Sequence, residues 1–144
     1  MAYTYTDALG ELKSYIDTNW NTSNVAKPTM NYIYDVIEFD LTFQGDWLLF
    51  YELTTTEKAS ALGNVGRDRT YNIRLDVRTN LSRDRIFNMT KEIKRLINSD
   101  VYHTFTTGKG LIELEETQDL SDKKKAMYRK IIDVKITKFN EVIS

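Results

Sequence analysis

The sequence predicts an α+β fold, in which two main helices pack on one face of a single, mostly antiparallel sheet. Two observations support this prediction. Apolar residues recur at spacings of three and four in residues 4–20 and again after Ser82, as they do on amphipathic helices. Apolar and polar residues alternate in other segments, as they do in half-buried strands. The predicted order is α-β-β-β-α-β-β, in which helices are interspersed with hairpins.

Length and composition are those of an ordinary globular protein. The chain has 144 residues and no evident linker, so we expect a single domain over residues 1–144. Its formal net charge is -1, whereas a dedicated duplex-DNA binder usually carries a clear basic excess. It has no cysteines, which excludes disulfide frameworks and thiolate metal sites. The first residues lack a signal-peptide pattern, and no apolar run is long enough to span a membrane.

The first third of the chain is predicted to form a helix followed by a β-hairpin. Residues 4–20 place their apolar side chains on one helical face. The polar segment 19–28, which ends at the only proline, is predicted to be a loop. Residues 37–43 alternate in polarity, and residues 47–53 are aromatic and almost continuously apolar. A short turn separates these two segments, so we expect them to pair as a hairpin.

The middle of the chain combines a polar segment with the clearest strand signal. Residues 54–69 are polar and contain two glycines, so they are predicted to form an extended loop or a flexible hairpin tip. Residues 71–79 alternate without interruption and are predicted to form a strand. Its apolar face comprises Tyr71, Ile73, Leu75 and Val77, and its polar face comprises Asn72, Arg74, Asp76 and Arg78.

The second helix is predicted to begin at Ser82, which is a favourable N-cap residue. Leu81 and Ile86 occupy the positions of a hydrophobic staple, which would fix the direction in which the chain enters the helix. Residues 111–116 are predicted to form a short acidic strand, and residues 130–139 alternate again and are predicted to form the last one.

Few residues are candidates for catalysis or metal binding. His103 is the only histidine, and without a positioned partner we interpret it as structural or exposed. Asp35, Glu38 and Asp40 are close enough in sequence to suggest the magnesium site of a nuclease. The same spacing arises whenever one face of a strand is solvated, and we favour that simpler interpretation.

The remaining charged and glycine-rich segments match no motif. Glu113, Glu115 and Glu116 lack the spacing of a metal site, and residues 63–66 match no phosphate-binding loop. The basic residues of the second helix and of residues 123–130 are diluted by nearby acids, as on a solvated surface. The sequence therefore predicts no catalytic residue, no metal and no cofactor, and we expect that the protein is not an enzyme.

The order of elements resembles a family of viral proteins. An N-terminal helix leads into a hairpin, and a long loop leads to the strand at residues 71–77. That strand passes directly into the helix that begins at Ser82, and two more strands close the chain. This arrangement is similar to the tail-terminator, or tail-completion, proteins that join head and tail in long-tailed phages and archaeal viruses.

The resemblance implies a virion structural protein that forms a homo-oligomeric ring, commonly of six subunits. Such a ring caps the finished tail tube and meets the head connector or neck protein, and duplex DNA passes through it during ejection. The protein would be made in the host cytoplasm and reside in the tail or neck of the virion. Two alternatives remain: a neck adaptor that forms no ring, and a small metal-dependent nuclease or resolvase that uses Asp35, Glu38 and Asp40.

Residues 54–70 are predicted to be the main contact with a partner protein. A loop of this length inside a compact domain is unusual and is often functional. It ends in two arginines, whose guanidinium groups can bind carboxylates of a partner. A solvent-exposed hairpin tip without a role is the alternative. The predicted partner-binding residues are Asn64, Arg67, Asp68 and Arg69.

Overall fold

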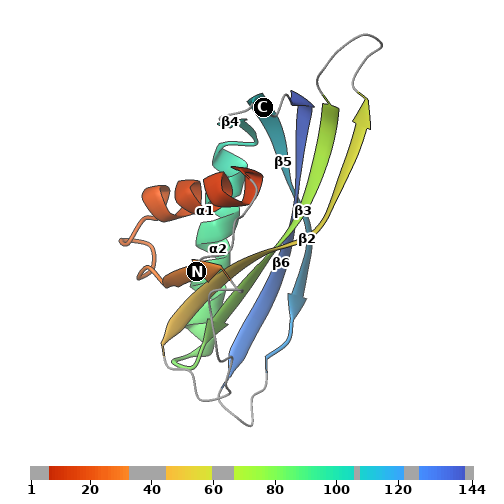
Figure 1. Cartoon of the computed structure of the whole chain (residues 1–144). Helices are drawn as coiled ribbons and strands as arrows, with labels where there is room; N and C mark the ends of the chain where they lie inside the picture. The colour runs from red at the N-terminus through yellow and green to blue at the C-terminus, as the bar shows by residue number, and fades with distance from the viewer. Residues whose placement is uncertain (1–6, 33–44, 60–66, 106–107, 122–126, 142–144) are drawn as a thin grey trace, which may run out of the picture.

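A computed structural model describes residues 7–32, 45–59, 67–105, 108–121 and 127–141. In these residues two helices cover one face of a curved sheet of six strands (Figure 1). The elements are α1 (Asp7–Asn19), β1 (Thr29–Tyr32), β2 (Asp46–Ala59), β3 (Arg67–Thr79), α2 (Arg83–Ser99), β4 (Tyr102–Phe105), β5 (Gly108–Asp119) and β6 (Tyr128–Glu141).

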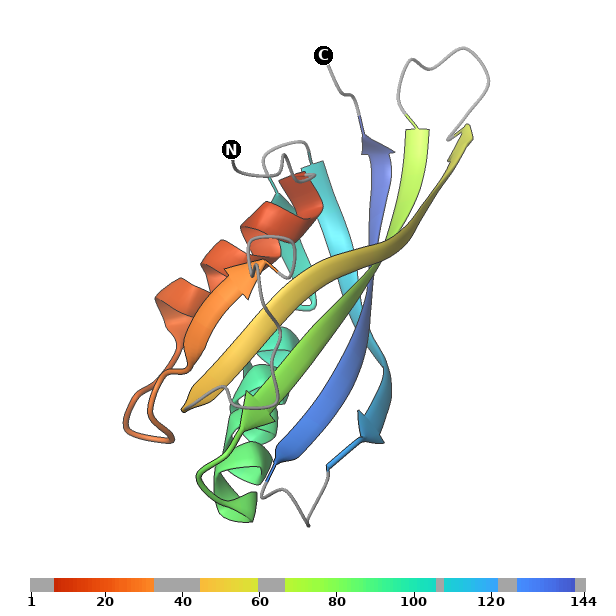
Figure 2. The ribbon, with the colours of Figure 1, turned by 60° about the horizontal axis from the view of Figure 1, so that its bottom comes forward.

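The strands lie in the order β1-β2-β3-β6-β5-β4. All neighbouring pairs are antiparallel except β1 and β2, which are parallel. The strands between β1 and β4, namely β2, β3, β6 and β5, are long, and the sheet twists strongly (Figure 2). The predicted α+β class and mostly antiparallel sheet are confirmed, and the predicted order is broadly consistent with the observed one. The prediction lacked the short strands β1 and β4, and its first strand, residues 37–43, lies outside the described residues.

The predicted boundaries in the middle of the chain need correction. Residues 37–43 lie outside the described residues, so their predicted hairpin with residues 47–53 stays a prediction. In the described residues, β2 pairs with β1 on one side and β3 on the other. Much of the predicted loop 54–69 is strand, because Thr54–Ala59 extend β2 and the residues from Arg67 onward extend β3. Threonine favours strands, and the long antiparallel pairing with β3 outweighs the polar character of this segment.

The core lies between the helices and the sheet. The predicted apolar face of β3 is confirmed, since none of Tyr71, Ile73, Leu75 and Val77 is more than 3% exposed. The loop after α1 closes one side, where the buried indole of Trp20 donates a hydrogen bond to the Val25 carbonyl oxygen, 3.0 Å away. The helical core residues are Ala8, Leu9, Leu12 and Ile16 of α1, and Ile86, Met89, Ile93, Leu96 and Ile97 of α2.

The start of α2 confirms one local prediction and corrects another. The Ser82 hydroxyl oxygen accepts a hydrogen bond from the Arg85 backbone N–H, so Ser82 is the N-cap as predicted. The hydrophobic staple is wrong, because Leu81 is 61% exposed while Ile86 is buried. The Leu81 N–H donates to the Thr79 hydroxyl, and this tight turn leaves the leucine side chain in solvent. In the described part of the chain, neither helix is long and apolar enough to cross a membrane.

Candidate assembly surface

On one side of the sheet, the described residues of β1 pair with only the first part of β2. β1 pairs with Trp47–Phe50 of β2 up to Tyr32, after which residues 33–44 lie outside the described residues. Beyond them Tyr51–Ala59, here called the open β2 edge, has β3 on one side and no strand of the described residues on the other. Its middle is uncharged and exposed: Leu53 is 43% exposed, and three exposed threonines follow it.

The opposite side of the sheet has a second open edge, toward the other end of the molecule. β4 pairs only with Gly108–Leu111 of β5, and the next N–H, that of Ile112, donates to the Val101 carbonyl oxygen. From Glu113 to Asp119, here called the open β5 edge, β5 has β6 on one side and no described strand on the other. This edge is acidic, and Glu115 on it is exposed.

The two edges differ in how charge, which normally prevents unwanted pairing, is distributed along them. Proteins usually protect open edges with charged residues, short strands or a covering element, because unpaired backbone groups attract other strands. The acids of the open β5 edge fit this pattern. The open β2 edge carries no charge from Leu53 to Thr56, but Glu52 lies before this stretch and Glu57 and Lys58 follow it, so both edges have charged residues.

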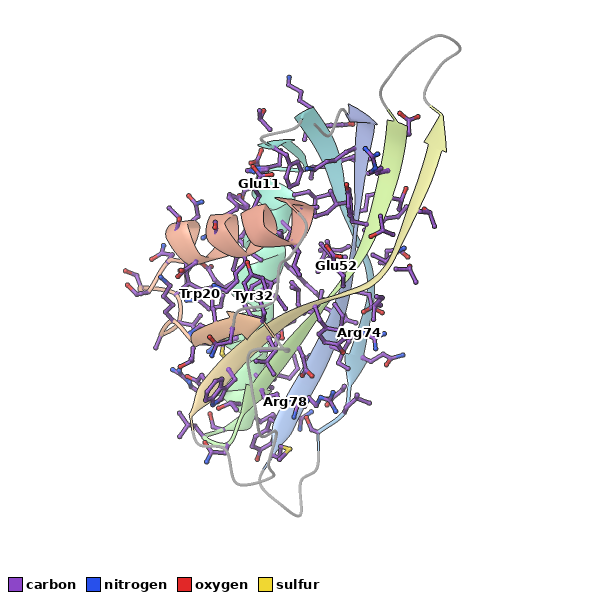
Figure 3. All side chains as sticks on the ribbon, viewed as in Figure 1. Glu11, Trp20, Tyr32, Glu52, Arg74 and Arg78 are labelled. Atoms are coloured by element: carbon purple, nitrogen blue, oxygen red, sulfur yellow. The ribbon has the colours of Figure 1, made fainter. Side chains whose placement is uncertain are left out.

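The sheet face opposite the helices is held by polar contacts between strands. Arg74 of β3 projects from the sheet away from the helices (Figure 3) and binds Asp133 of β6 with two hydrogen bonds, of 2.7 and 3.1 Å. The hydrogen bond to Asp133 raises the pKa of Arg74 above its usual range. Next to it, the Asn72 amide donates to the Thr54 hydroxyl at 2.8 Å and links β3 to β2. These contacts fix the register of the central strands.

Asp76 forms a buried charge cluster on the same face. Its carboxylate is fully buried and accepts two hydrogen bonds each from Arg78 and Arg129, at 2.8–3.1 Å. Burial raises the pKa of Asp76, but the hydrogen bonds from the two arginines outweigh it and hold the pKa below its usual value. Both guanidinium groups therefore bind a carboxylate of the same subunit.

A second buried carboxylate fastens the loop after α1 to α2. Glu92 accepts hydrogen bonds from the Asn21 N–H at 2.7 Å, the Asn24 amide at 2.9 Å and the Arg95 guanidinium at 2.7 Å. The Arg95 bonds are the main reason why the pKa of Glu92 falls to about 2. A hollow of about 410 Å³ beside it is lined by Asn24, Asn88, Lys91, Glu92 and Arg95. Because Glu92 is saturated with donors, we interpret this site as structural.

The only histidine packs between an α1 residue and its own strand. His103 is half-buried, with ring centroids 5.1 Å from Tyr15 and 4.7 Å from Phe105. Its Nδ1 lies 2.5 Å from a carboxylate oxygen of Asp100. These contacts fit the structural role expected for His103. A shallow hollow of about 310 Å³ lies beside it, lined by Glu11, Ser14, Tyr15, Thr18, Asn19 and His103.

A buried ion pair joins α1 to the sheet near the same end. The ammonium group of Lys138 is 3.8 Å from the Glu11 carboxylate and 4.5 Å from the centre of the Phe105 ring. Lys138 is fully buried, whereas the Glu11 side chain is 26% exposed. The aromatic ring and the carboxylate together offset the cost of burying this charge.

The candidate residues from the sequence are only partly placed. Asn64 lies outside the described residues, whereas Arg67, Asp68 and Arg69 begin β3 at the end of the β2–β3 hairpin, away from both helices (Figure 1). Asp35, Glu38 and Asp40 lie outside the described residues, and no group of three acidic or histidine side chains in the rest could hold a metal. The sequence analysis did not anticipate the two edges, because it predicted neither β1 nor β4.

Comparisons with known proteins give a likeness in structure only. No family model matches the sequence. No curated protein matches it significantly. Among solved structures, a chain described as "Virion of native gene transfer agent (GTA) particle" is similar, with a TM-score of 0.62 over 92% of each chain. The two sequences are 12% identical, so the likeness is one of fold.

Proposed function

We propose that the protein is a virion structural component, and that it acts as a tail terminator whose ring caps the tail tube and joins it to the head connector. The observation that carries this proposal is the structural likeness to a chain of a gene transfer agent virion, which extends over 92% of both chains. A match of this length includes both helices and the sheet, so it is a likeness of the whole arrangement.

The open edges support self-assembly. They lie on opposite sides of the sheet, so each copy offers two different surfaces to two neighbours. Contacts between different surfaces of identical subunits generate rings when the rotation closes. A ring is the assembly that the proposed role requires, and six copies is the number that we expect.

The far end of the β2–β3 hairpin is the part of the subunit that we assign to partner contact. Arg67, Asp68 and Arg69 lie where this hairpin extends away from the helices (Figure 1), and Asn64 belongs to the segment that joins the two strands. In the proposed ring, this end reaches the tail tube protein or the head connector. Arginine at such a position can form bidentate hydrogen bonds with carboxylates of the partner.

The pairing of the arginines on the sheet face opposite the helices is consistent with DNA in passage rather than DNA held tightly. Arg74, Arg78 and Arg129 all bind carboxylates of the same chain. Affinity for duplex DNA comes mainly from cations that neutralise phosphates, and these three arginines already share the two carboxylates of Asp76 and Asp133, which offset most of their charge. The net charge of -1 points the same way.

Native mass spectrometry of the purified protein, alone and mixed with the tail tube protein of the same virus, tests the proposal. We expect a closed oligomer in at least the mixture, because a tail tube can act as the template for the ring. A strict monomer under both conditions would rule out the proposed function. Replacing residues 60–67 by a short Gly-Ser turn should leave the melting temperature near that of the wild type but abolish tube capping. If this variant caps tubes normally, the end of the hairpin is not the partner contact.

A further inference from the structure

We infer that the hollow beside Glu92 is the site at which one copy of the protein binds the next, through the carboxylates of Glu113 and Glu115 on the β5 strand of the neighbouring copy. The inference rests on the proposed ring and names its subunit interface. It uses side chains on two exposed surfaces and does not depend on the pairing of any strand edge. Glu92 itself holds the fold together, but the hollow beside it also offers hydrogen-bond donors and positive charge.

The hollow contains donor groups that the subunit itself leaves unused. Asn88, Lys91 and Arg95 are exposed and line the hollow from one face of α2, because they are three and four residues apart. Among the described residues, the side chains of Asn88 and Lys91 bind no partner. Arg95 binds Glu92 through Nε and Nη2, at 2.7 Å each, and Nη2 also lies 3.5 Å from the Asn19 carbonyl oxygen. The N–H groups of Arg95 Nη1 therefore remain available for an incoming carboxylate.

The charges in the hollow leave Lys91 without an opposing carboxylate. Glu92 is ionised at neutral pH, because the Arg95 hydrogen bonds lower its pKa to about 2. Glu92 and Arg95 balance each other, so the charge of Lys91 remains. One uncompensated cation beside a buried carboxylate suits an acidic side chain better than duplex DNA, whose rows of phosphates require several free cations.

The acids of β5 form the complementary surface. Ile112 and Leu114 pack against the core, so Glu113 and Glu115 lie on the sheet face opposite the helices, where both are exposed. Lys135 of β6 faces Glu113 across the strand pair, whereas Glu115 belongs to a β-bulge and has no cross-strand partner. Within the part of the chain that the structure describes, neither acid forms an ion pair. Glu115 is therefore the acid with the least compensation.

The two surfaces match in spacing and in charge. Lys91 and Arg95 are four helical residues apart, which is about 6 Å along the helix. Glu113 and Glu115 are two strand residues apart, which is about 7 Å along the strand. We assign Glu115 to Lys91, since both lack compensation, and Glu113 to Arg95. When the carboxylate bound to Arg95 and the lysine that faces Glu113 are included, each cation of the contact is balanced by one carboxylate.

The positions of the two surfaces give each copy two different neighbours. α2 presents the hollow on the helix side of the subunit, and β5 presents its acids on the opposite side of the sheet (Figure 1). Two copies cannot form both contacts with each other: when the helix side of one copy faces the sheet of the second, the helix side of the second points away. Such contacts between different surfaces of identical subunits generate rings when the rotation closes.

Charge reversal tests the contact in native mass spectrometry, under the conditions in which the wild type forms rings. Lys91→Glu and Glu115→Lys should each raise the protein concentration needed for rings at least about tenfold, because like charges then face each other across the interface. The double variant with both substitutions restores opposite charges and should form rings as the wild type does. Circular dichroism should show all three variants folded.

Lys94→Glu is the matched control, because it makes the same change of charge on α2 at a residue that does not line the hollow. It should leave ring formation unchanged, and an equal loss of rings would overturn the assignment to the hollow. Normal rings of Lys91→Glu, or a folded double variant that fails to assemble, refute the contact but leave the proposed function standing. If Lys91→Glu weakens binding to duplex DNA while rings persist, the hollow serves DNA and the inference is wrong. A wild type that never assembles refutes both the contact and the proposed function.

Discussion

Replacing Glu92 by glutamine should weaken the fold by an amount that depends on pH. The Arg95 hydrogen bonds, with those from Asn21 and Asn24, lower the pKa of Glu92 from 4.5 to about 2. At about 1.4 kcal/mol per unit, this shift corresponds to about 3 kcal/mol of stability at neutral pH. Glutamine keeps the shape of the side chain, but it loses the charge and turns an amide N–H₂ toward groups that are themselves donors.

The direction of the pH effect follows from the lowered pKa. A carboxyl group with a depressed pKa stabilises the fold above its unfolded value of 4.5, and that contribution is lost as the pH falls toward about 2. Glu92→Gln should therefore cost about 3 kcal/mol at pH 7 and progressively less below pH 4.5, approaching no cost near pH 2. Other carboxylates titrate in both proteins, so the difference between variant and wild type isolates Glu92.

Urea unfolding followed by tryptophan fluorescence measures this difference. Trp20 reports on the relevant region, because its indole N–H binds the Val25 carbonyl oxygen within the loop that Glu92 holds. Glu115→Gln is the matched control: Glu115 is exposed on β5, and its loss should cost less than about 0.5 kcal/mol. Equal effects of the two variants at pH 7, or the same effect of Glu92→Gln at pH 7 and pH 3, would refute the reasoning.

Four further substitutions test other contacts. Asp76→Asn should cost about 3–5 kcal/mol in urea unfolding, because it leaves buried guanidinium groups without their carboxylate, and a loss below 1 kcal/mol would contradict this. Lys138→Met should cost less than about 1 kcal/mol of stability, because the partly exposed Glu11 can be rehydrated. Glu11→Gln should cost about 1–2 kcal/mol, because it removes a carboxylate from a buried ammonium group. A larger cost for Lys138→Met than for Glu11→Gln would refute this account. Gly110→Ala should lower the melting temperature, because its Cβ would lie 2.6 Å from Cε2 of Phe105, and an unchanged value would show that the ring moves freely.

Local patterns predicted the elements that have one clearly apolar face. The alternation from Tyr71 to Val77 identified β3 and its core face, because a strand between helices and solvent must alternate. Ser82 identified the start of α2, because a helix N-terminus needs a side-chain acceptor. Both predictions depend on residues that are close in sequence.

Contacts between distant residues could not be predicted in this way. Asp76 was assigned to the polar face of its strand, yet it is fully buried, because Arg129, 53 positions later, binds it. Glu92 is buried by the loop after α1, and its bond to the Asn21 N–H spans 71 positions. Thr54 to Thr56 look like loop residues until β3 pairs with them. In each case the deciding partner lies in another element.

The central claim is that this protein is a terminator at the junction of head and tail. The most direct measurement is to purify the virions and locate the protein in them by immunogold labelling with electron microscopy. We predict label at the head-proximal end of the tail tube, one cluster per particle. Particles without the protein, or label along the tail or over the head, would contradict this account.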